Sequence, residues 1–389
     1  MKRFLPVVLT LLSFALHAAE PSAKVEIRRV PERGIKPSVV ADAGGALHMV
    51  WFSGDPQAGD ALYATSKDGG ATWSQAVRVN SQPGSVLGVS HARGPHLALG
   101  RGGRVHVLWL GSQKAEPAGN PDKPQPGAKR QYAPMPMLYS RMDEKGAVFE
   151  PQRKIITHAA GLDGDGALAA DSAGHVYVVV HAREPGDMGE AQRSVYVARS
   201  DDDGATFATE RRVLPEPSGV CACCALTARV DGAGRLVILY RQAWQTFERG
   251  MNLLTSGDGG KTFQLSMLDD WKLAACPMSV SALLASRTGV LGAWENGGQI
   301  FWGTPGGEVR PLPGRGGTRK GPSLAVNAHG ETLVAWTENT SFAGGGDVVW
   351  QVFGADGQAT EAAGRRNDLP PHGWIAAASK PDGGFVVLY

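Results

Sequence analysis

A fifteen-residue unit that recurs along this 389-residue chain constrains the fold more than any other feature. It reads "PSVVADAGGALHMVW" from Pro37, "PHLALGRGGRVHVLW" from Pro95 and "PSLAVNAHGETLVAW" from Pro322, and a Trp follows each Pro after fourteen positions. Weaker copies read "ALAADSAGHVYVVV" from Ala167, "TARVDGAGRLVILY" ending at Tyr240, "ALLASRTGVLGAW" ending at Trp294 and "AAASKPDGGFVVLY" ending at Tyr389. Each copy is a pair of short apolar runs around a Gly or Asp turn, the pattern of two antiparallel strands. The repeat therefore predicts seven strand pairs of one architecture.

A second hairpin signal follows several of these units. It reads "SKDGGATW" at 66–73, "SDDDGATF" at 200–207 and "SGDGGKTF" at 256–263. These strings match the Asp-box S-x-D-x-G-x-T-[WF], so the chain resembles the sialidase-like β-propellers with BNR repeats over nearly all of its length, and "SRMDEKGAVF" at 140–149 is similar to a degenerate copy. An Asp side chain can bind local backbone N–H groups in a tight turn, and Gly supplies positive φ. We therefore expect Asp68, Asp202 and Asp258 to stabilise turns and to have no role in binding a ligand.

The predicted fold class is an all-β propeller of six to seven four-stranded blades. Each Pro-to-Trp unit supplies the two inner strands of a blade, and each Asp-box the turn between the third and fourth strands. Seven units favour seven blades, whereas the sialidase resemblance implies six. The last unit stops at Tyr389, so we expect a strand from "KVEIRR" at 24–29 to complete the last blade and cover its exposed edge.

The N-terminus has the pattern of a secretory signal. Lys2 and Arg3 precede an apolar run over 4–16 that is too short to span a bilayer. We expect residues 1–19 to be the signal peptide and residues 20–389 to form a single propeller domain. No second apolar stretch of spanning length follows, so the sequence predicts no membrane span and a periplasmic or extracellular protein.

Overall charge excludes one class of partner. Without Lys2 and Arg3, the 39 Lys and Arg residues fall to 37 and balance the 37 Asp and Glu residues. A neutral balance argues against nucleic acid or an anionic membrane as a partner. The expected partner is a small molecule, a glycan or a protein.

The propeller geometry predicts where that partner binds. The innermost strands should all begin on one face, which carries the mouth of the central channel and lies opposite the Asp-boxes. Polar residues near those strand starts are Arg33, His91, Arg93, Asp163, Asp165, Arg319, Lys320 and His372, and those at the ends of the second strands are His181, Arg183, Arg241, Glu295 and Glu338. The same face should carry the long irregular segment at 111–137. Binding residues usually lie on loops held by a rigid scaffold, so this mouth is the candidate site.

Three of the four cysteines lie in the segment "SGVCACCALTARVDG" at 218–232. Cys221, Cys223 and Cys224 precede the inner strand of the fourth repeat, and Cys276 precedes that of the fifth, so we expect one site between adjacent blades. An oxidising compartment favours disulfides. If the segment is extended, Cys221 and Cys223 point to one side. We expect Cys276 to pair with one of these two, or to share a metal with both, and Cys224 to be the odd member.

Two further interpretations of the cysteines remain open. Closely spaced thiolates with a neighbouring His suit a copper or zinc ion, with the candidate ligands Cys221, Cys223, Cys224, Cys276 and His91. Alternatively, a thiol whose pKa is lowered by a cation such as Arg241 would be redox-active or nucleophilic.

The family resemblance also implies an enzymatic activity. A sialidase needs an Arg trio for the substrate carboxylate, a Tyr nucleophile with a Glu, and an Asp acid/base. The candidates are Arg93, Arg241 and Arg319 for the trio, Tyr240 with Glu295 for the nucleophile, and Asp163 or Asp165 for the acid. The Arg-Ile-Pro motif typical of the family is replaced by "RGIKPSVV" at 33–40, in which Arg33 and Lys36 are poor substitutes. The departure puts sialidase activity in doubt, since a fold alone does not carry an activity.

The sequence therefore predicts an exported propeller that acts as a binding module, with a cysteine-lined site, disulfide or metal, at the channel mouth. The alternative is an exo-sialidase or another glycoside hydrolase. A glycosidase needs two carboxyl groups about 5 to 9.5 Å apart in an open pocket, whereas a thiol or metal site needs the four sulfurs close together.

Overall fold

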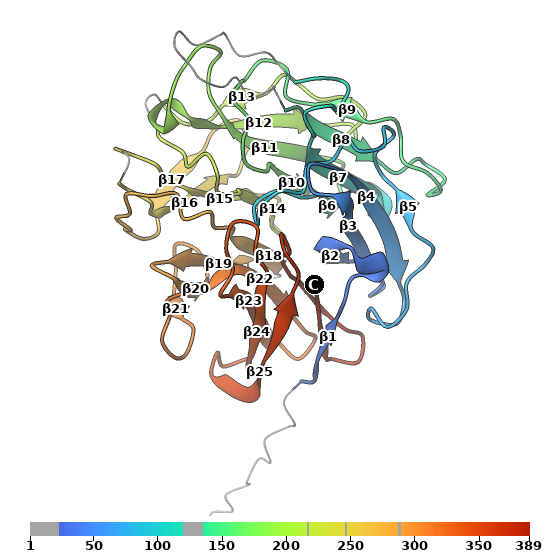
Figure 1. Ribbon diagram of the computed structural model, residues 1–389, viewed down its shortest axis with the longest axis vertical. Helices are drawn as coiled ribbons and strands as arrows, with labels where there is room; N and C mark the ends of the chain where they lie inside the picture. Colours follow the sequence, from blue (N-terminus) through green and yellow to red (C-terminus); the bar gives the residue numbers. More distant parts are fainter. Residues whose placement is uncertain (1–22, 120–134, 216–217, 246, 287–288) are drawn as a thin grey trace, which may run out of the picture.

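The computed structural model describes residues 23–119, 135–215, 218–245, 247–286 and 289–389. Within these residues the strands form seven sheets arranged as blades around a central axis, six of four strands and one of three (Figure 1). The predicted all-β propeller is confirmed, with seven blades rather than six. The predicted signal at 1–19, and residues 120–134 of the long irregular segment, lie outside the described residues.

In each of blades one to six, successive strands pair with one another from the axis outwards. The innermost strands are β2 (Ile35–Ala41), β6 (His96–Leu99), β10 (Ala167–Ala170), β14 (Thr227–Val230), β18 (Ala282–Ser286), β22 (Lys320–Val326) and β26 (Ala376–Ser379). The second strands are β3 (Leu47–Asp55), β7 (Val105–Leu110), β11 (Val176–Ala182), β15 (Leu236–Arg241), β19 (Gly289–Asn296), β23 (Thr332–Glu338) and β27 (Phe385–Leu388). The third strands are β4 (Ala58–Ser66), β8 (Met137–Arg141), β12 (Ser194–Ser200), β16 (Met251–Ser256), β20 (Gln299–Gly303), β24 (Gly346–Phe353) and, in blade seven, β1 (Val25–Arg28). The outer strands are β5 (Val77–Arg78), β9 (Arg153–Lys154), β13 (Arg211–Arg212), β17 (Gln264–Met267), β21 (Val309–Pro311) and β25 (Ala359–Leu369), and the 3-10 helices are η1 (Pro31–Arg33), η2 (Arg101–Gly103) and η3 (Glu190–Gln192).

The recurring unit forms the first two strands of every blade, as its pattern predicts. In blade one, Val39 pairs with Met49 and Val40 with His48 across β2 and β3. Every residue of β7 and β11 is buried, because both faces of a middle strand contact a neighbouring blade. Such strands are apolar on both faces rather than alternating.

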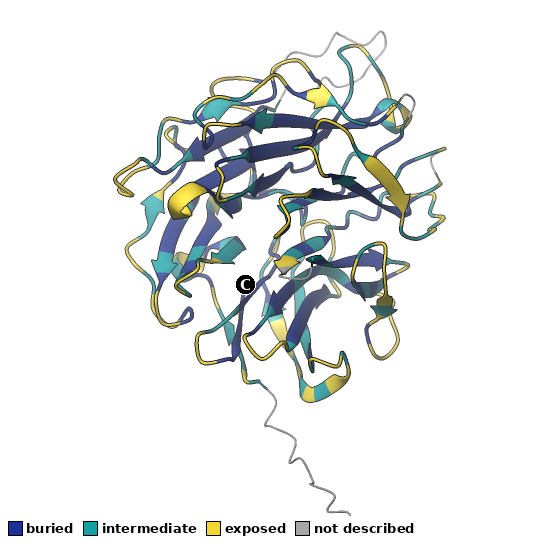
Figure 2. Cartoon of the chain, turned by 180° about the vertical axis from the view of Figure 1, so that it is seen from behind, coloured by how far each residue is buried: buried dark blue, intermediate teal, exposed yellow. Residues whose placement is uncertain are grey.

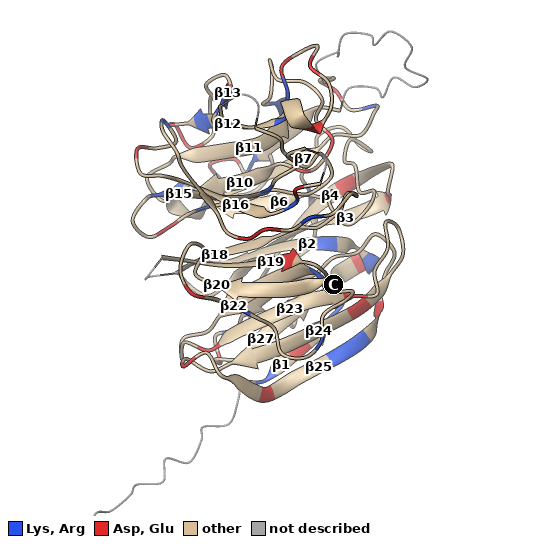
Figure 3. Cartoon of the chain, turned by 90° about the vertical axis from the view of Figure 1, so that its left-hand side faces the viewer, with Lys and Arg blue, Asp and Glu red and all other residues tan. Residues whose placement is uncertain are grey.

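The hydrophobic core is divided among the contacts between blades. Tyr177 of β11 and Tyr240 of β15, for example, belong to one buried cluster between blades three and four. Figure 2 shows the buried residues along the middle strands and the exposed ones mostly on loops and outer edges. In the side view of Figure 3, charged residues gather at strand ends, on loops and on β25, while the middle strands carry few. Charged side chains that could bind a ligand therefore lie mainly at the two faces of the ring.

The Asp-boxes form the turns that their sequences predict. In the box at 200–207, one carboxylate oxygen of Asp202 accepts hydrogen bonds from the Ser200 hydroxyl (2.7 Å) and the Thr206 N–H (2.8 Å), and the other accepts one from the Thr206 hydroxyl (2.6 Å). Asp68 and Asp258 make the corresponding contacts. These bonds occupy the carboxylates within their own turns.

Strand register places the boxes on the face away from the cysteines, as expected. In blade four, Ser256 at the start of a box pairs with Leu236, at the beginning of β15. The other end of β15 is Arg241, whose carbonyl accepts the Cys221 N–H at 3.0 Å. The box and the cysteine segment therefore lie at opposite ends of the same strand.

Blade seven joins the two ends of the described chain. Strand β1 runs parallel to β27, with Val25 paired to Phe385 and Arg28 to Leu388. Beyond this sheet, the Val30 N–H donates to the carbonyl of Tyr389 at 2.9 Å. Closure of the last blade by the N-terminal strand is thus confirmed, although this blade has three strands in the described residues rather than four. No helix among the described residues is long and apolar enough to cross a membrane.

Candidate functional site

All seven innermost strands line a central channel of about 810 Å³. Most lining side chains are small or apolar, and the polar exceptions include Asp42, His96 and Arg229. The predicted site is the mouth at the end where the innermost strands begin. There, two groups of buried polar side chains lie in different sectors of the ring: a charged group at blades one to three and a sulfur group at blades four and five.

Asp165 is the centre of the charged group. Its Oδ2 atom accepts hydrogen bonds from the Gly94 N–H (2.6 Å) and from His96 Nε2 (3.1 Å), and its Oδ1 atom has no hydrogen bond from another group of the described chain. Burial raises the pKa of this fully enclosed carboxyl, against the opposing effect of His96. His96 is partly exposed and lines the channel, so Asp165 contacts the channel through the imidazole.

Lys36 supplies a second buried charge beside Asp165. Its ammonium donates to the Ser90 carbonyl and lies 4.9 Å from the centre of the Trp374 ring. Burial lowers the pKa of Lys36 to about 7, while the charge of Asp165 opposes that shift. Its backbone adopts a φ of 59°, and Ser90 has a φ of 67°. Such left-handed conformations are costly for residues with side chains and cluster at functional sites.

Arg93 and Asp163 form the accessible edge of this group. The Arg93 guanidinium contacts Asp163 twice, at Oδ1 (2.6 Å) and at the backbone carbonyl (2.7 Å). The Asp163 side chain is 42% exposed, whereas that of Arg93 is 12% exposed. The Asp163 carboxylate is therefore accessible, and Arg93 fixes its position.

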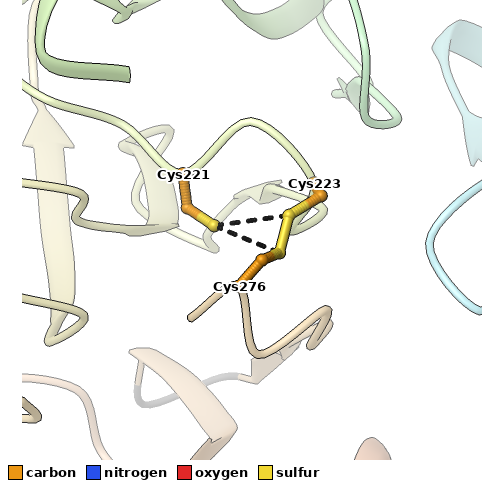
Figure 4. A group of neighbouring side chains, drawn as sticks. All are labelled: Cys221, Cys223 and Cys276. Carbon is orange, nitrogen blue, oxygen red and sulfur yellow. Dashed lines mark hydrogen bonds between the residues drawn. A yellow bond between two sulfur atoms is a disulfide. The ribbon is translucent and has the colours of Figure 1, made fainter. Parts of the chain in front are cut away.

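The sulfur group contains all four cysteines. Cys223 and Cys276 form a disulfide between the segments that lead into blades four and five, with Cα atoms 6.8 Å apart. The Cys221 sulfur lies 3.9 Å from that of Cys223 and 4.0 Å from that of Cys276 (Figure 4). The four sulfurs lie together, as expected, and the pairing of Cys276 with a member of the triplet is confirmed. Cys224 is indeed not the partner, but Cys221 is free as well.

The two free thiols contact each other. The Cys221 thiol donates to the Cys224 sulfur over 3.2 Å, and both residues are buried. This hydrogen bond, followed by burial, raises the pKa of Cys221. Burial also raises the pKa of Cys224, but the bond from Cys221 and the charge of Arg241 outweigh it and lower that pKa to about 7. The expected influence of Arg241 on a thiol is therefore present, at Cys224.

A network of charges holds the cysteine segment in place. The Ala222 N–H donates to Glu190 Oε1 at 3.0 Å, and Arg249 donates to Glu190 Oε2 at 2.9 Å. The guanidinium of Arg241 donates to the carbonyls of Arg249 (2.6 Å) and Glu295 (2.7 Å). These bonds fix the thiols between two blades rather than on a loose loop.

Each arginine expected for a sialidase binds groups of the protein itself. Arg93 binds Asp163, Arg241 binds carbonyls of blades four and five, and Arg319 binds Glu338, Gln299 and the Pro313 carbonyl. The three arginines thus belong to three different junctions between blades, each with partners of its own.

The expected nucleophile pair is also separated. The Tyr240 ring lies in the core between blades three and four, and its hydroxyl accepts a hydrogen bond from Asn252 at 3.1 Å. Glu295 is on blade five, where burial raises its pKa and the charge of Lys320 opposes the shift. The Tyr240 ring faces blade three, so the sheet of blade four lies between this ring and blade five.

His91 lies apart from the sulfur group. Its Nδ1 atom is 3.0 Å from the Gly373 carbonyl, and its Nε2 atom contacts the Ser341 carbonyl. Both ring nitrogens are occupied by backbone of blades six and seven. Among the described residues, the group with metal-ligand spacing contains Cys221, Cys223 and Cys276 and not His91.

Sequence reasoning missed several residues of the mouth. His96, Glu190, Arg249 and Trp374 were not among its candidates, and Lys36 was considered only as a substitute for an Arg motif. His96 lies on an innermost strand one position after Pro95, where the repeat has Ser in "PSVV" and "PSLA". That break in the repeat was the available signal. Glu190 and Arg249 are in loops, where the repeat gives no guidance.

The chain matches no protein-family model and no curated protein by sequence. Solved structures match it by fold. An α-L-arabinanase from Penicillium chrysogenum in complex with arabinobiose has 15% identity and a TM-score of 0.52, over 84% of this chain and 95% of its own. An α-L-arabinofuranosidase from Fusarium graminearum with an iminosugar inhibitor has 12% identity and a TM-score of 0.53, over 89% and 98%. An ulvan lyase bound to -[GlcA(1-4)Rha3S]- has 11% identity and a TM-score of 0.51, over 89% and 87%.

Sialidases are also among the matches, at TM-scores below 0.5. Similarities at these identities concern the fold alone. The chain is a seven-bladed β-propeller, and the expected likeness to sialidase-like propellers is confirmed at the level of the fold.

Proposed function

We propose that the protein is an exported β-propeller that binds a glycan at its channel mouth. The observation that carries the proposal is the charged group beside the channel, where Arg93 holds the exposed carboxylate of Asp163 and the His96 imidazole lines the channel. Asp165 is enclosed and contacts the channel through His96. A ligand with many hydroxyl groups can donate hydrogen bonds to the Asp163 carboxylate and can bind the imidazole.

The charged group of blades one to three supports a sugar ligand in particular. Asp163 offers an exposed acceptor, His96 a ring nitrogen at the channel, and Trp374 an aromatic face beside Lys36. Convergent polar groups beside an aromatic ring suit a hydroxylated ring that is polar at its edge and apolar on its faces. Three of the structural matches, each with a TM-score above 0.5, are named for sugar substrates or sugar ligands, which supports the same ligand class here.

A glycoside hydrolase is the second candidate. Asp163 is exposed beside Arg93, while burial raises the pKa of Asp165. Two carboxyl groups in contrasting environments are the usual arrangement for acid/base work. Sialidase chemistry is less well supported, since each of the three arginines binds groups of the protein itself and Tyr240 lies in the core. Export rests on the pattern of residues 1–19 and remains part of the proposal.

Titration calorimetry tests glycan binding. We use arabinobiose, 3′-sialyllactose and a glucuronate–rhamnose-3-sulfate disaccharide as probes. At least one should bind, and Arg93→Ala should weaken that binding at least tenfold because Asp163 loses its positioning partner. Asp202→Asn, on the opposite face, is the matched control and should bind as the unchanged protein does. No heat with any probe, or equal binding by the Arg93 variant, would contradict the proposal.

Chromogenic arabinofuranosides and a fluorogenic sialoside distinguish binding from hydrolysis. We expect no turnover above background from the folded protein. Turnover that disappears in Asp163→Asn would establish the glycosidase instead, and turnover of the sialoside that disappears in Tyr240→Phe would restore the sialidase assignment.

Copper or zinc binding at Cys221, Cys223, Cys224 and Cys276 stays a prediction for the reduced chain. A metal ion needs thiolate ligands, and two of the four sulfurs are joined in the disulfide. The expected donor set is the four sulfurs without His91, whose ring nitrogens both contact carbonyls.

A further inference from the structure

The spacing and contacts of the cysteines define two pairs rather than one bridge and two spare thiols. Cys221 and Cys224 form a C-x-x-C pair with their sulfurs 3.2 Å apart. The other pair is the Cys223–Cys276 disulfide, and the Cys221 sulfur touches both of its sulfurs, at 3.9 and 4.0 Å. Cys221 is therefore central: it contacts the sulfurs of Cys223 and Cys276 (Figure 4) as well as that of Cys224.

We propose that the four cysteines form a thiol–disulfide exchange centre, in which the buried Cys221/Cys224 pair and the Cys223–Cys276 disulfide exchange bonding partners. The external substrate class is a protein or small-molecule thiol or disulfide that reaches the channel mouth. This inference is independent of glycan binding, because it rests on the sulfur contacts alone.

The exchange takes place in two balanced steps. The Cys221 thiolate attacks the Cys276 sulfur, a Cys221–Cys276 bond forms, and Cys223 leaves as a thiolate. The Cys224 thiolate then attacks the Cys221 sulfur, a Cys221–Cys224 bond forms, and Cys276 leaves as a thiolate. One disulfide is broken for each one made, and the two protons of the buried thiols pass to Cys223 and Cys276. No external oxidant or reductant is needed for this isomerisation.

Burial gives the two pairs different roles. Cys221 and Cys224 are 0% and 3% exposed, whereas Cys223 and Cys276 are only partly buried. After the exchange, the thiols of Cys223 and Cys276 lie at the accessible side. One of them can attack the disulfide of an external partner, and the other can then release the partner as a dithiol. The partner gains two electrons, and the protein is left with the bonds Cys221–Cys224 and Cys223–Cys276.

The surroundings of Cys224 support the second step. A thiolate is the attacking species in disulfide exchange, and it is most effective when its pKa is near the ambient pH. Burial alone would raise the pKa of Cys224, but the Cys221 thiol and the Arg241 charge lower it to about 7 before the exchange, against an opposing effect of Glu295. In the second step Cys221 is part of a disulfide and has no thiol proton to donate, so the Arg241 charge is the influence that continues to favour the Cys224 thiolate. A buried cysteine without such partners would be inert.

Differential alkylation with mass spectrometry tests the proposal on the full mature chain. The protein is equilibrated in glutathione buffers of increasing oxidised fraction and quenched in acid. Free thiols are alkylated in denaturant, and the remaining cysteines are reduced and labelled with a heavy alkylating reagent. We expect Cys221 and Cys224 to be found oxidised in at least a tenth of the molecules under conditions in which Cys223 and Cys276 become thiols to the same extent. Cys223 and Cys276 fully oxidised, with Cys221 and Cys224 fully reduced, in every buffer short of global reduction would overturn the proposal.

Two variants separate the steps. In Cys221→Ser, Cys224 should no longer become oxidised, and only the Cys223–Cys276 bond should be found. In Cys224→Ser, exchange should stop after the first step, with a Cys221–Cys276 bond and a free thiol at Cys223. Ala222→Ser, in the same segment, keeps all four sulfurs and should exchange as the unchanged protein does. Circular dichroism checks that each variant folds, and a stoichiometric copper or zinc ion that protects all four thiols from alkylation would also refute the exchange centre.

Discussion

The guanidinium of Arg241 on blade four donates a 2.7 Å hydrogen bond to the backbone carbonyl of Glu295 on blade five. The same group binds the Arg249 carbonyl and lies 4.9 Å from the centre of the Trp271 ring. Arg241 therefore links the two blades that carry the cysteines, and it places a buried positive charge near Cys224. A single side chain thus contributes to both the stability and the chemistry of the sulfur group.

Replacement of Arg241 should affect both properties. Arg241→Met loses the hydrogen bonds to two buried carbonyls, so we expect the free energy of unfolding to fall by about 3 kcal/mol. Urea denaturation measures this change. The thiol of Cys224 should also be less reactive at pH 7, because its pKa rises when the cation is removed. Arg241→Lys keeps the charge and should recover part of the reactivity, whereas a Met variant as stable as the unchanged protein would disprove the structural role.

Stability should increase with pH above neutrality because of Lys36. Burial lowers its pKa from the usual 10.5 to about 7 in the folded protein. Between these two values the unfolded chain binds a proton that the folded chain does not, so the folded state gains about 1.4 kcal/mol for each pH unit as pH rises. Below about pH 7 the penalty for the buried charge is complete. Lys36→Met should remove this slope and raise stability at pH 7.

Urea titrations at pH 7, 8 and 9 measure the effect of Lys36. Lys24→Met provides the control, because Lys24 has a side chain that is 80% exposed and should keep the slope of the unchanged protein. If the free energy of unfolding changes with pH in the same way in the unchanged protein and in Lys36→Met, folding does not lower the pKa of Lys36 and the prediction is wrong.

The interblade disulfide should stabilise the fold. Cys223 and Cys276 are 53 residues apart in sequence, and closing a loop of that length removes enough entropy from the unfolded chain to contribute ~4 kcal/mol. Unfolding midpoints with and without dithiothreitol should differ accordingly. Cys223→Ser is informative here, since Cys276 can then pair with Cys221 and recover part of the loss. Equal midpoints in both conditions would indicate that the bridge is not formed in solution.

The Asp-box turns should weaken in acid. Hydrogen bonds from the Thr206 hydroxyl and N–H, against a small effect of burial, lower the pKa of Asp202 to about 2. Its stabilising contribution is therefore present above about pH 4 and is lost as pH falls towards 2. Asp202→Asn should lower the melting temperature at pH 7 and have little further effect near pH 2. Asp201→Asn, at the exposed neighbouring position, is the control, and an equal loss in both variants would contradict the turn mechanism.

The blades were predictable because their signals are local. The Pro-to-Trp unit encodes two strands and a turn within fifteen residues, and Asp202, Ser200 and Thr206 carry the chemistry of a box turn within seven. The last repeat ends at Tyr389 without outer strands, so its blade needed a strand from another part of the chain. That strand is β1. Nothing in these signals depends on a distant contact, so a single sequence was sufficient.

The mouth was only partly predictable, because its contacts join blades. Strand alternation gives Tyr240 and Arg241 opposite directions, yet both were placed in one catalytic hypothesis on the basis of position. The partners of Arg241 are backbone carbonyls, which leave no pattern in the sequence. Similarly, Lys36 is buried against Trp374 of blade seven, and its backbone has a left-handed conformation. No sequence motif predicts this conformation. For Cys276, strand alternation in the cysteine segment left two possible disulfide partners, Cys221 and Cys223. The structure shows that the partner is Cys223.

The pairing of Val25 with Phe385 has a kinetic consequence. Strand β1 is synthesised before every other strand of the ring but has no partner until β27 exists, so the ring cannot close while the chain is being made. Bringing such distant segments together carries a loop-closure cost, and folds with many non-local contacts form slowly. After β27 has been synthesised and before β1 pairs with it, the edge of β27 and one side of blade one are open to other chains. The slowest step of folding should therefore be the docking of the first strand, and this interval is when the protein is most exposed to aggregation.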